Sequence, residues 1–255
     1  MPHVAHETGT VRYRKEGDGP GLVLVHGASG DAQANWAHLM PGFADIRTVI
    51  APDYAGSGET SDPGGDLTLD LLADQVAATF EGPSDLVGFS LGSAVAVTLA
   101  TRRPELVRRL VLIAGWTHLA DSRLELGLRT WARLADTDPE SHAAYGPLLG
   151  FSPGFAAGIG VKTLMEGEAP HGAVRQIELC LRVDVRDLLP KIAMPTLVIG
   201  AAKDYLIPVE HHRALHAAIP GSAYAEIDSG HVVLHEHPEE VTRLIRNFVT
   251  DETNG

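Results

Sequence analysis

The chain has 255 residues, of which 44% are hydrophobic and 21% charged, and its formal net charge at pH 7 is −13. This composition fits a globular protein with a substantial core and excludes a disordered chain. The acidic balance and the lack of a Lys/Arg cluster argue against a nucleic-acid partner, because phosphate binding needs concentrated positive charge.

Strand-like and helix-like patterns alternate along most of the chain. Residues Thr10–Arg14 alternate between polar and apolar side chains, as an edge strand does, and a glycine-rich turn follows them. Short apolar runs then recur, which is typical of strands buried on both faces of a parallel sheet. These runs are residues 22–25, 48–51, 85–88, 110–113 and 196–199. Helices are predicted at 66–80, 91–102 and 238–249, so the expected fold class is α/β, with a mostly parallel central sheet and helices on both faces.

The alternation stops between about residues 116 and 191. This stretch contains helical patterns and a Gly/Pro-rich part, but no convincing strand. The strand pattern resumes just before Thr196, so the chain leaves and re-enters the same sheet. We therefore predict a core made of residues 1–115 and 192–255, with residues 116–191 inserted as a small helical cap.

One turn carries the strongest chemical signal in the sequence. Gly88-Phe89-Ser90-Leu91-Gly92 has the pattern G-x-S-x-G, directly after an apolar strand and directly before a helix. A turn this tight strains the serine backbone and lifts its hydroxyl clear of the surface, while the glycines prevent clashes with the neighbouring elements. The context predicts that Ser90 is a nucleophile.

A serine nucleophile needs a base that is itself oriented by an acid. His231 and Asp204 each follow a strand-like segment, so both are expected at the carboxyl edge of the sheet. Asp228 is the rival acid, and its place on the strand favours a structural role. The other late histidines are expected at solvated positions: His211, His212 and His216 on a surface helix, and His235 and His237 at a helix start.

Developing negative charge on a substrate oxygen requires two backbone N–H donors. One is expected from Leu91, the residue after the nucleophile, and the other from Ala28 in the loop that follows the first buried strand. His26 is expected to brace this loop rather than to transfer protons. Ser29 could donate a supporting hydrogen bond or be an ordinary loop residue.

Taken in order, these motifs resemble the α/β-hydrolase fold superfamily over nearly the whole chain. His26-Gly27 follows one strand, and Asp53-Tyr54-Ala55-Gly56-Ser57-Gly58-Glu59-Thr60-Ser61 is similar to the family's D-x-x-G-x-G-x-S loop. The chain looks most like the small esterase, enol-lactonase and perhydrolase-like members with a helical cap. The resemblance implies a hydrolase with a Ser90–His231–Asp204 triad. Members with an aspartate nucleophile, such as haloalkane dehalogenases, are disfavoured because the turn carries Ser90.

The predicted activity is hydrolysis of an ester, lactone or thioester of a medium-sized hydrophobic small molecule through an acyl-enzyme. Abundant Ala and Gly and an excess of Arg over Lys resemble the composition of chains from high-GC actinobacteria, and this resemblance suggests a role in secondary metabolism. A cyclase, lyase or C–C bond-cleaving enzyme could use the same residues, and so could a non-catalytic receptor. No metal or cofactor is expected, because no ligand spacing or dinucleotide motif occurs. Candidate substrate-binding residues are Phe89, Trp116, Trp131, Phe151 and Val232.

The single cysteine, Cys180, lies among apolar residues at helical spacing, which predicts a buried thiol and no disulfide. The first residues lack the basic and apolar stretches of a signal peptide. No apolar run approaches the roughly 18 residues that span a bilayer. We therefore expect a cytoplasmic protein with no membrane partner, while the oligomeric state is left open.

Overall fold

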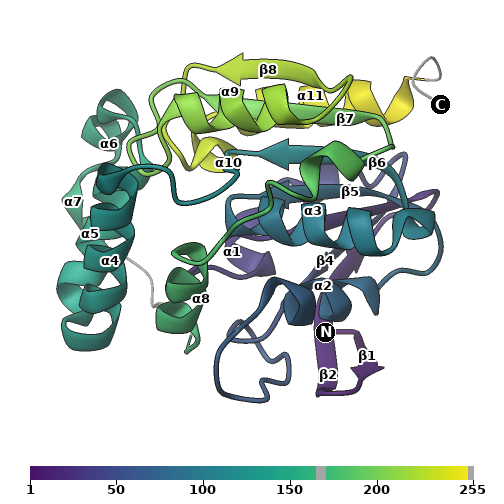
Figure 1. The fold of residues 1–255 in the computed structure, drawn as a ribbon, viewed down its shortest axis with the longest axis horizontal. Coiled ribbons are helices and arrows are strands. Elements are labelled where there is room, and N and C mark those ends of the chain that lie inside the picture. Colours follow the sequence, from purple (N-terminus) through teal and green to yellow (C-terminus); the bar gives the residue numbers. More distant parts are fainter. Residues whose placement is uncertain (165–170, 252–255) are drawn as a thin grey trace.

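The computed structural model describes residues 1–164 and 171–251. Within them, an eight-stranded sheet has the order β1-β2-β4-β3-β5-β6-β7-β8 (Figure 1). The strands are β1 (His3–His6), β2 (Gly9–Glu16), β3 (Gly21–Val25), β4 (Thr48–Pro52), β5 (Ser84–Phe89), β6 (Val107–Ile113), β7 (Thr196–Ala201) and β8 (Ala223–Ile227). Strands β1, β2 and β4 pair antiparallel, and the pairs from β4 to β8 are parallel. The predicted α/β class with a mostly parallel sheet is confirmed.

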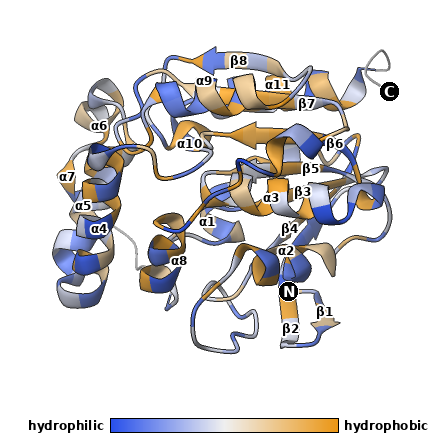
Figure 2. Ribbon diagram, in the orientation of Figure 1, coloured by the Kyte–Doolittle hydropathy of each residue, from blue (hydrophilic) through white to orange (hydrophobic). Residues whose placement is uncertain are grey.

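Helices cover both faces of this sheet. They are α1 (Ala32–Trp36), α2 (Leu69–Ala77), α3 (Leu91–Arg102), α4 (Ser122–Thr137), α5 (Pro139–Gly150), α6 (Pro153–Ile159), α7 (Val161–Leu164), α8 (Ala173–Cys180), α9 (Val209–Ala218), α10 (Val233–Glu236) and α11 (Pro238–Thr250). Short 3₁₀ turns lie at Met40–Gly42, Pro104–Leu106 and Leu189–Lys191. In Figure 2 the central strands are mostly hydrophobic, whereas the covering helices carry both kinds of residue. None of the described helices is both long and apolar enough to cross a membrane.

The central strands are mostly hydrophobic because both of their faces are covered. In β3, Val23 and Val25 belong to the hydrophobic cluster that also contains residues of α2 and α3. Leu22 and Leu24 belong to the cluster on the other face, with residues of α1 and α11. Successive side chains of a strand point to opposite faces, so a strand covered on both sides is apolar at most positions. All five apolar runs are therefore strands, as predicted.

The amino-terminal end of the sheet differs from the prediction. The segment Thr10–Arg14 lies within β2, but β2 is not an edge strand, because β1 pairs with it from outside. No strand was predicted at His3–His6, which form β1. Their burial alternates between exposed and half-buried. A short strand with one solvated face and two histidines has too weak a hydrophobic pattern to be recognised.

Helices α4 to α8 lie between β6 and β7 in the chain. Figure 1 shows α4 to α7 stacked beyond the carboxyl ends of the parallel strands. Among the described residues of this segment, the only β pairing is an isolated bridge between His118 and Asp184. Helix α8 returns toward the sheet and contributes Ile177 and the buried Cys180 to a core cluster. Burial raises the pKa of the Cys180 thiol to about 12, so it stays protonated. The division into core and cap stays a prediction.

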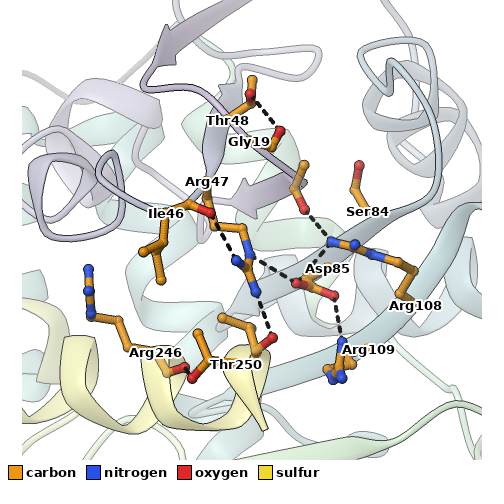
Figure 3. Close-up of polar contacts among 12 residues, drawn as sticks. Gly19, Ile46, Arg47, Thr48, Ser84, Asp85, Arg108, Arg109, Arg246 and Thr250 are labelled. Carbon is orange, nitrogen blue, oxygen red and sulfur yellow. Dashed lines mark hydrogen bonds and ion pairs between the residues drawn. The ribbon is translucent and has the colours of Figure 1, made fainter. Parts of the chain in front are cut away.

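The amino end of β5 holds a buried acidic side chain among arginines (Figure 3). The Asp85 side chain is inaccessible, with its carboxylate 3.3 Å from Arg47 Nε, 3.1 Å from Arg108 Nη2 and 3.8 Å from Arg109 Nη1. Arg47 also donates to the carbonyl of Val249 at 2.6 Å. This cluster, Asp85 with Arg47, Arg108 and Arg109, joins two central strands to the end of α11. It lies at the opposite end of β5 from Ser90.

Candidate active site

Ser90 occupies the sharp turn between β5 and α3. Its φ is +53° and its ψ −121°, a conformation that costs a non-glycine residue free energy. The amide of Ser90 donates to the carbonyl of Ile113 on β6 at 2.9 Å, which holds the turn against the sheet. A Cβ at Gly88 would overlap the carbonyl of Gly92, and a Cβ at Gly92 would overlap the backbone of β3. Both glycines are therefore required by the close approach of strand and helix.

Three side chains predicted from different parts of the sequence meet at this turn. His231 Nε2 lies 2.9 Å from Ser90 Oγ, and His231 Nδ1 lies 2.6 Å from Asp204 Oδ2. Only 7%, 4% and 7% of the surfaces of Ser90, His231 and Asp204 are exposed. A carboxylate can only accept, so the ring proton belongs on Nδ1 and Nε2 can accept the serine proton. The arrangement can deprotonate Ser90 as it attacks an electrophilic carbon.

Asp204 is oriented by the backbone that follows it. Its Oδ1 accepts from the amides of Leu206 at 2.9 Å and Ile207 at 2.7 Å, which leaves Oδ2 to face His231. The rival acid, Asp228, is exposed and pairs with Lys203 at 2.7 Å. The preference for Asp204 over Asp228 therefore agrees with the observed geometry.

The structure corrects the expected position of His212. A surface helix was predicted, but the described α9 packs its His212 side chain entirely out of solvent, and His211 is also buried. His212 Nδ1 accepts from the amide of Ala201 at 3.2 Å, so a neutral ring carries its proton on Nε2, 3.4 Å from Asp204 Oδ2. The signal that could have revealed this position is helical spacing, because His212 and Leu215 share the buried face of α9 and Ile219, just past its end, is also buried.

Burial makes His212 an acid-sensitive position, because it lowers the pKa of the ring to about 4. The unfolded value is about 6.5, so the stability from the neutral ring is complete above pH 6.5 and declines as the pH falls toward 4. Between pH 7 and 4.5, urea denaturation should show the native protein losing about 2 kcal/mol more unfolding free energy than His212→Asn. Asparagine can still accept from Ala201, so equal losses in both proteins would contradict this assignment.

The loop after β3 includes Ala28, which lines the same cavity as Ser90. Tyr54 Oη donates to the carbonyls of His26 and Gly27, both at 3.0 Å, and His26 Nδ1 lies 2.8 Å from the Gly27 carbonyl. The amide of Gly27 donates to Asn35 Oδ1 at 2.9 Å, and that of Ser29 to Gln176 Oε1 at 2.9 Å. Among the described residues, the Ala28 amide between them has no acceptor.

Leu91, directly after the serine, supplies a second backbone amide. It is the first residue of α3, where the initial N–H groups have no intrahelical partner and carry partial positive charge. The amides of Ala28 and Leu91 thus lie in the two segments that flank Ser90. Such a pair can stabilise an oxyanion that forms on a carbonyl attacked by the serine. His26 holds the loop through its hydrogen bond to Gly27, as expected.

Ser90 and His231 open onto a cavity of about 670 Å³. Among the described residues that line it, none has a Lys, Arg, Asp or Glu side chain. Its walls are Gly27, Ala28, Ser29, Gly30, Asn35, Phe89, Ser90, Trp131, Gly146, Pro147, Gly150, Phe151, Phe155, Ile159, Thr163, Leu164, Leu206, His231, Val232 and His235. Within residues 1–164 and 171–251, no group of three or more His, Cys, Asp or Glu could hold a metal ion. The cavity suits an uncharged, mainly apolar molecule.

Four of the five predicted substrate-binding residues line this cavity: Phe89, Trp131, Phe151 and Val232. Trp116 does not. It is only 2% exposed and belongs to a hydrophobic core cluster, so its assignment to the cavity wall was wrong. A tryptophan just past a strand can pack under the following helices as well as above the site, and sequence spacing does not distinguish the two.

The segment between β6 and β7 is hydrogen-bonded to the loop that carries His231. The amide of Val232 donates to the carbonyl of Gly150 at 2.9 Å. Glu236 accepts from the amide and hydroxyl of Ser152, both at 2.6 Å, and from the amide of Gly230 at 3.1 Å. Sequence reasoning missed Glu236 because its partner lies 84 residues away in the chain.

Comparisons with known proteins agree with this geometry. The model of the alpha/beta hydrolase family matches residues 22–244. The pyrrolizixenacetamide deacetylase of Xenorhabdus hominickii is 40% identical over 253 residues, which cover 95% of both chains. A pimeloyl-[acyl-carrier protein] methyl ester esterase of Neisseria meningitidis is 30% identical over 92% of this chain and 79% of its own.

A solved structure extends the likeness to the fold. The enol-lactonase from Burkholderia xenovorans superposes with a TM-score of 0.87 at 23% identity, over 98% of this chain and 100% of its own. At that identity the likeness concerns the fold alone. The family match spans β3 to α11 and includes the turn at Ser90 and both of its partners. The chain therefore belongs to the alpha/beta hydrolase family of enzymes.

Proposed function

We propose that the protein is a serine hydrolase that cleaves an ester-type or amide bond of an uncharged small molecule through an acyl-enzyme on Ser90. The observation that carries the proposal is the unbroken chain of hydrogen bonds from Ser90 Oγ through His231 to Asp204, opening on a cavity whose described lining residues include no Lys, Arg, Asp or Glu. The deacetylase and methyl ester esterase named among the relatives support acyl transfer to water.

In the first half-reaction, Ser90 Oγ attacks the carbonyl carbon while His231 Nε2 takes the hydroxyl proton. The amides of Ala28 and Leu91 hold the oxyanion, and the Asp204 carboxylate stabilises the imidazolium. The bond to the leaving group then breaks, and His231 returns the proton to the departing oxygen, sulfur or nitrogen. Ser90 is left as an acyl ester.

In the second half-reaction, a water molecule takes the place of the leaving group. His231 removes a proton from the water as its oxygen attacks the acyl carbon, and the same two amides hold the second oxyanion. Collapse of this intermediate returns the proton to Ser90 Oγ and releases a carboxylic acid. One water is consumed for each bond cleaved.

The cavity supports a medium-sized, mainly apolar substrate. Its aromatic walls, Trp131, Phe151 and Phe155, provide apolar area, while Asn35 and Thr163 can orient a polar group. The substrate classes that we propose are esters, lactones and thioesters, and also amides because of the deacetylase relative. A role in secondary metabolism is part of the proposal and is supported by the abundance of Ala and Gly and the excess of Arg over Lys.

The test combines covalent labelling with isotope incorporation. Phenylmethylsulfonyl fluoride should add one sulfonyl group to the native protein, located on Ser90 by peptide mass spectrometry, and none to Ser90→Ala. Turnover of p-nitrophenyl acetate and of a matched aromatic acetamide in heavy-oxygen water should place one heavy oxygen in the acetate released. Thr163→Ala, which alters the cavity wall only, should still be labelled.

The possible outcomes separate the competing functions. Labelled Ser90 with heavy oxygen in the product supports the proposal. Labelled Ser90 with a product that lacks heavy oxygen would indicate a cyclase, a lyase or another non-hydrolytic enzyme. An unlabelled Ser90 in a folded protein without esterase activity would overturn the acyl-enzyme and leave a binding protein.

A further inference from the structure

Gln176 joins helix α8 to the loop after β3. Its side chain is completely buried. Oε1 accepts from the amide of Ser29 at 2.9 Å, and Nε2 donates to Ser57 Oγ at 2.9 Å and to the carbonyl of Ala55 at 3.2 Å. Ser57 Oγ donates in turn to the carbonyl of Gly30 at 2.6 Å. Gln176 therefore connects α8 directly to the amide of Ser29 and, through Ser57, to the carbonyl of Gly30.

The loop at this point is conformationally strained. Ser29 has a φ of +56°, in the left-handed region that favours glycine. Such a conformation persists only where surrounding contacts determine it, and it is often found at functional sites. The hydrogen bond from the Ser29 amide to Gln176 fixes the peptide plane between Ala28 and Ser29. On the other side, the Gly27 carbonyl is held by Tyr54 and His26.

We propose that Gln176 is a positioning residue for the oxyanion site, aiming the Ala28 N–H by holding the Ser29 amide. The inference rests on the proposed function, because it assigns a purpose to the Ala28 donor in that reaction. Gln176 touches no reacting atom, and it is not among the cavity-lining residues. Its effect passes from the Ala28–Ser29 peptide, through the backbone dihedral angles of Ala28, to the neighbouring Gly27–Ala28 peptide that carries the N–H. The segment between β6 and β7 would then contribute to catalysis as well as to the cavity walls.

The test replaces Gln176 by leucine, which has a similar size but no hydrogen-bonding groups. With p-nitrophenyl acetate, we expect kcat to fall by about 10- to 100-fold, because a misdirected donor weakens stabilisation of the transition state. KM should change by less than about threefold, because the ground-state carbonyl depends little on the oxyanion donors. Gln176→Asn keeps the amide but shortens the arm, and it should show the same loss if the leucine variant does not fold.

Arg175→Ala is the matched control. Arg175 precedes Gln176 on α8 and also binds a core loop, through Asp62 and the carbonyl of Gly65, but it does not contact the loop at Ser29. Its loss should lower the melting temperature while leaving kcat within about threefold of the native value. Comparing the two variants separates positioning of the donor from general loosening of α8.

Each outcome decides between these explanations. A loss of kcat confined to the Gln176 variants supports the inference. Equal losses in Arg175→Ala, an unchanged kcat in folded Gln176→Leu, or a change in KM alone would overturn it. A native protein that is neither labelled at Ser90 nor active on esters would instead refute the proposed function, so the two failures are distinguishable.

Discussion

Replacing Asp204 by asparagine is expected to lower kcat for an ester substrate by about 10⁴-fold while leaving the fold intact. The amides of Leu206 and Ile207 both donate to Oδ1, so an asparagine must place its own oxygen there. Its NH₂ group then faces His231 Nδ1 and donates to it. The ring proton is forced onto Nε2, which can no longer accept the proton of Ser90.

Asp228→Asn is the matched control for this prediction. Asp228 lies three residues before His231, but its carboxylate is exposed and pairs with Lys203. Steady-state kinetics should show less than a twofold change in kcat for Asp228→Asn. Retention of more than a tenth of the native rate by Asp204→Asn would show that Asp204 is not the orienting acid.

The second large effect is expected at Asp85. Substitution by alanine leaves Arg47, Arg108 and Arg109 around an empty acceptor position, and removing one partner of a buried ionic cluster costs about 3 to 5 kcal/mol. We expect the unfolding free energy to fall by that amount in urea denaturation. Because Asp85 and Ser90 lie at opposite ends of β5, the remaining folded enzyme should keep its kcat.

Asp74→Ala provides the comparison for an exposed ion pair. Asp74 lies 3.2 Å from Arg102, but both side chains are about 40% exposed. Exposed pairs contribute about 0 to 1 kcal/mol, so this variant should be almost as stable as the native protein. Similar losses in Asp74→Ala and Asp85→Ala would show that the buried position of Asp85 has no special importance.

The sequence allowed the central sheet and the nucleophile to be predicted for the same reason. A strand covered on both faces is apolar at most positions, as β5 is from Leu86 to Phe89 before the turn at Ser90, so a short stretch of sequence is enough to recognise it. Asp204 could be chosen because it follows such a strand, β7, and His231 because it follows the alternating pattern of β8. The edge strand β1 has one solvated face, which left it without a comparable signal.

The residues that support the site were beyond sequence reasoning because their roles depend on contacts between distant segments. Gln176 reaches a loop 147 residues away in the chain, and His212 reaches Asp204 only because α9 packs against β7. A polar side chain on a helix is more often solvated than buried, so its burial cannot be read from its type. Trp116 shows the converse error, since an aromatic residue near the site was assigned to the cavity but lies in the core.

The hydrogen bonds at Gly150, Ser152 and Gln176 also limit how this enzyme can be recombined with its relatives. A chimera that exchanges the segment between β6 and β7 would separate Ser152 from Glu236 and Gln176 from Ser29. Grafts that keep both pairs should retain the geometry around Ser90, while the cavity-facing positions near Trp131 and Phe155 can vary. Libraries aimed at new substrates would therefore preserve these anchoring pairs and diversify the walls between them.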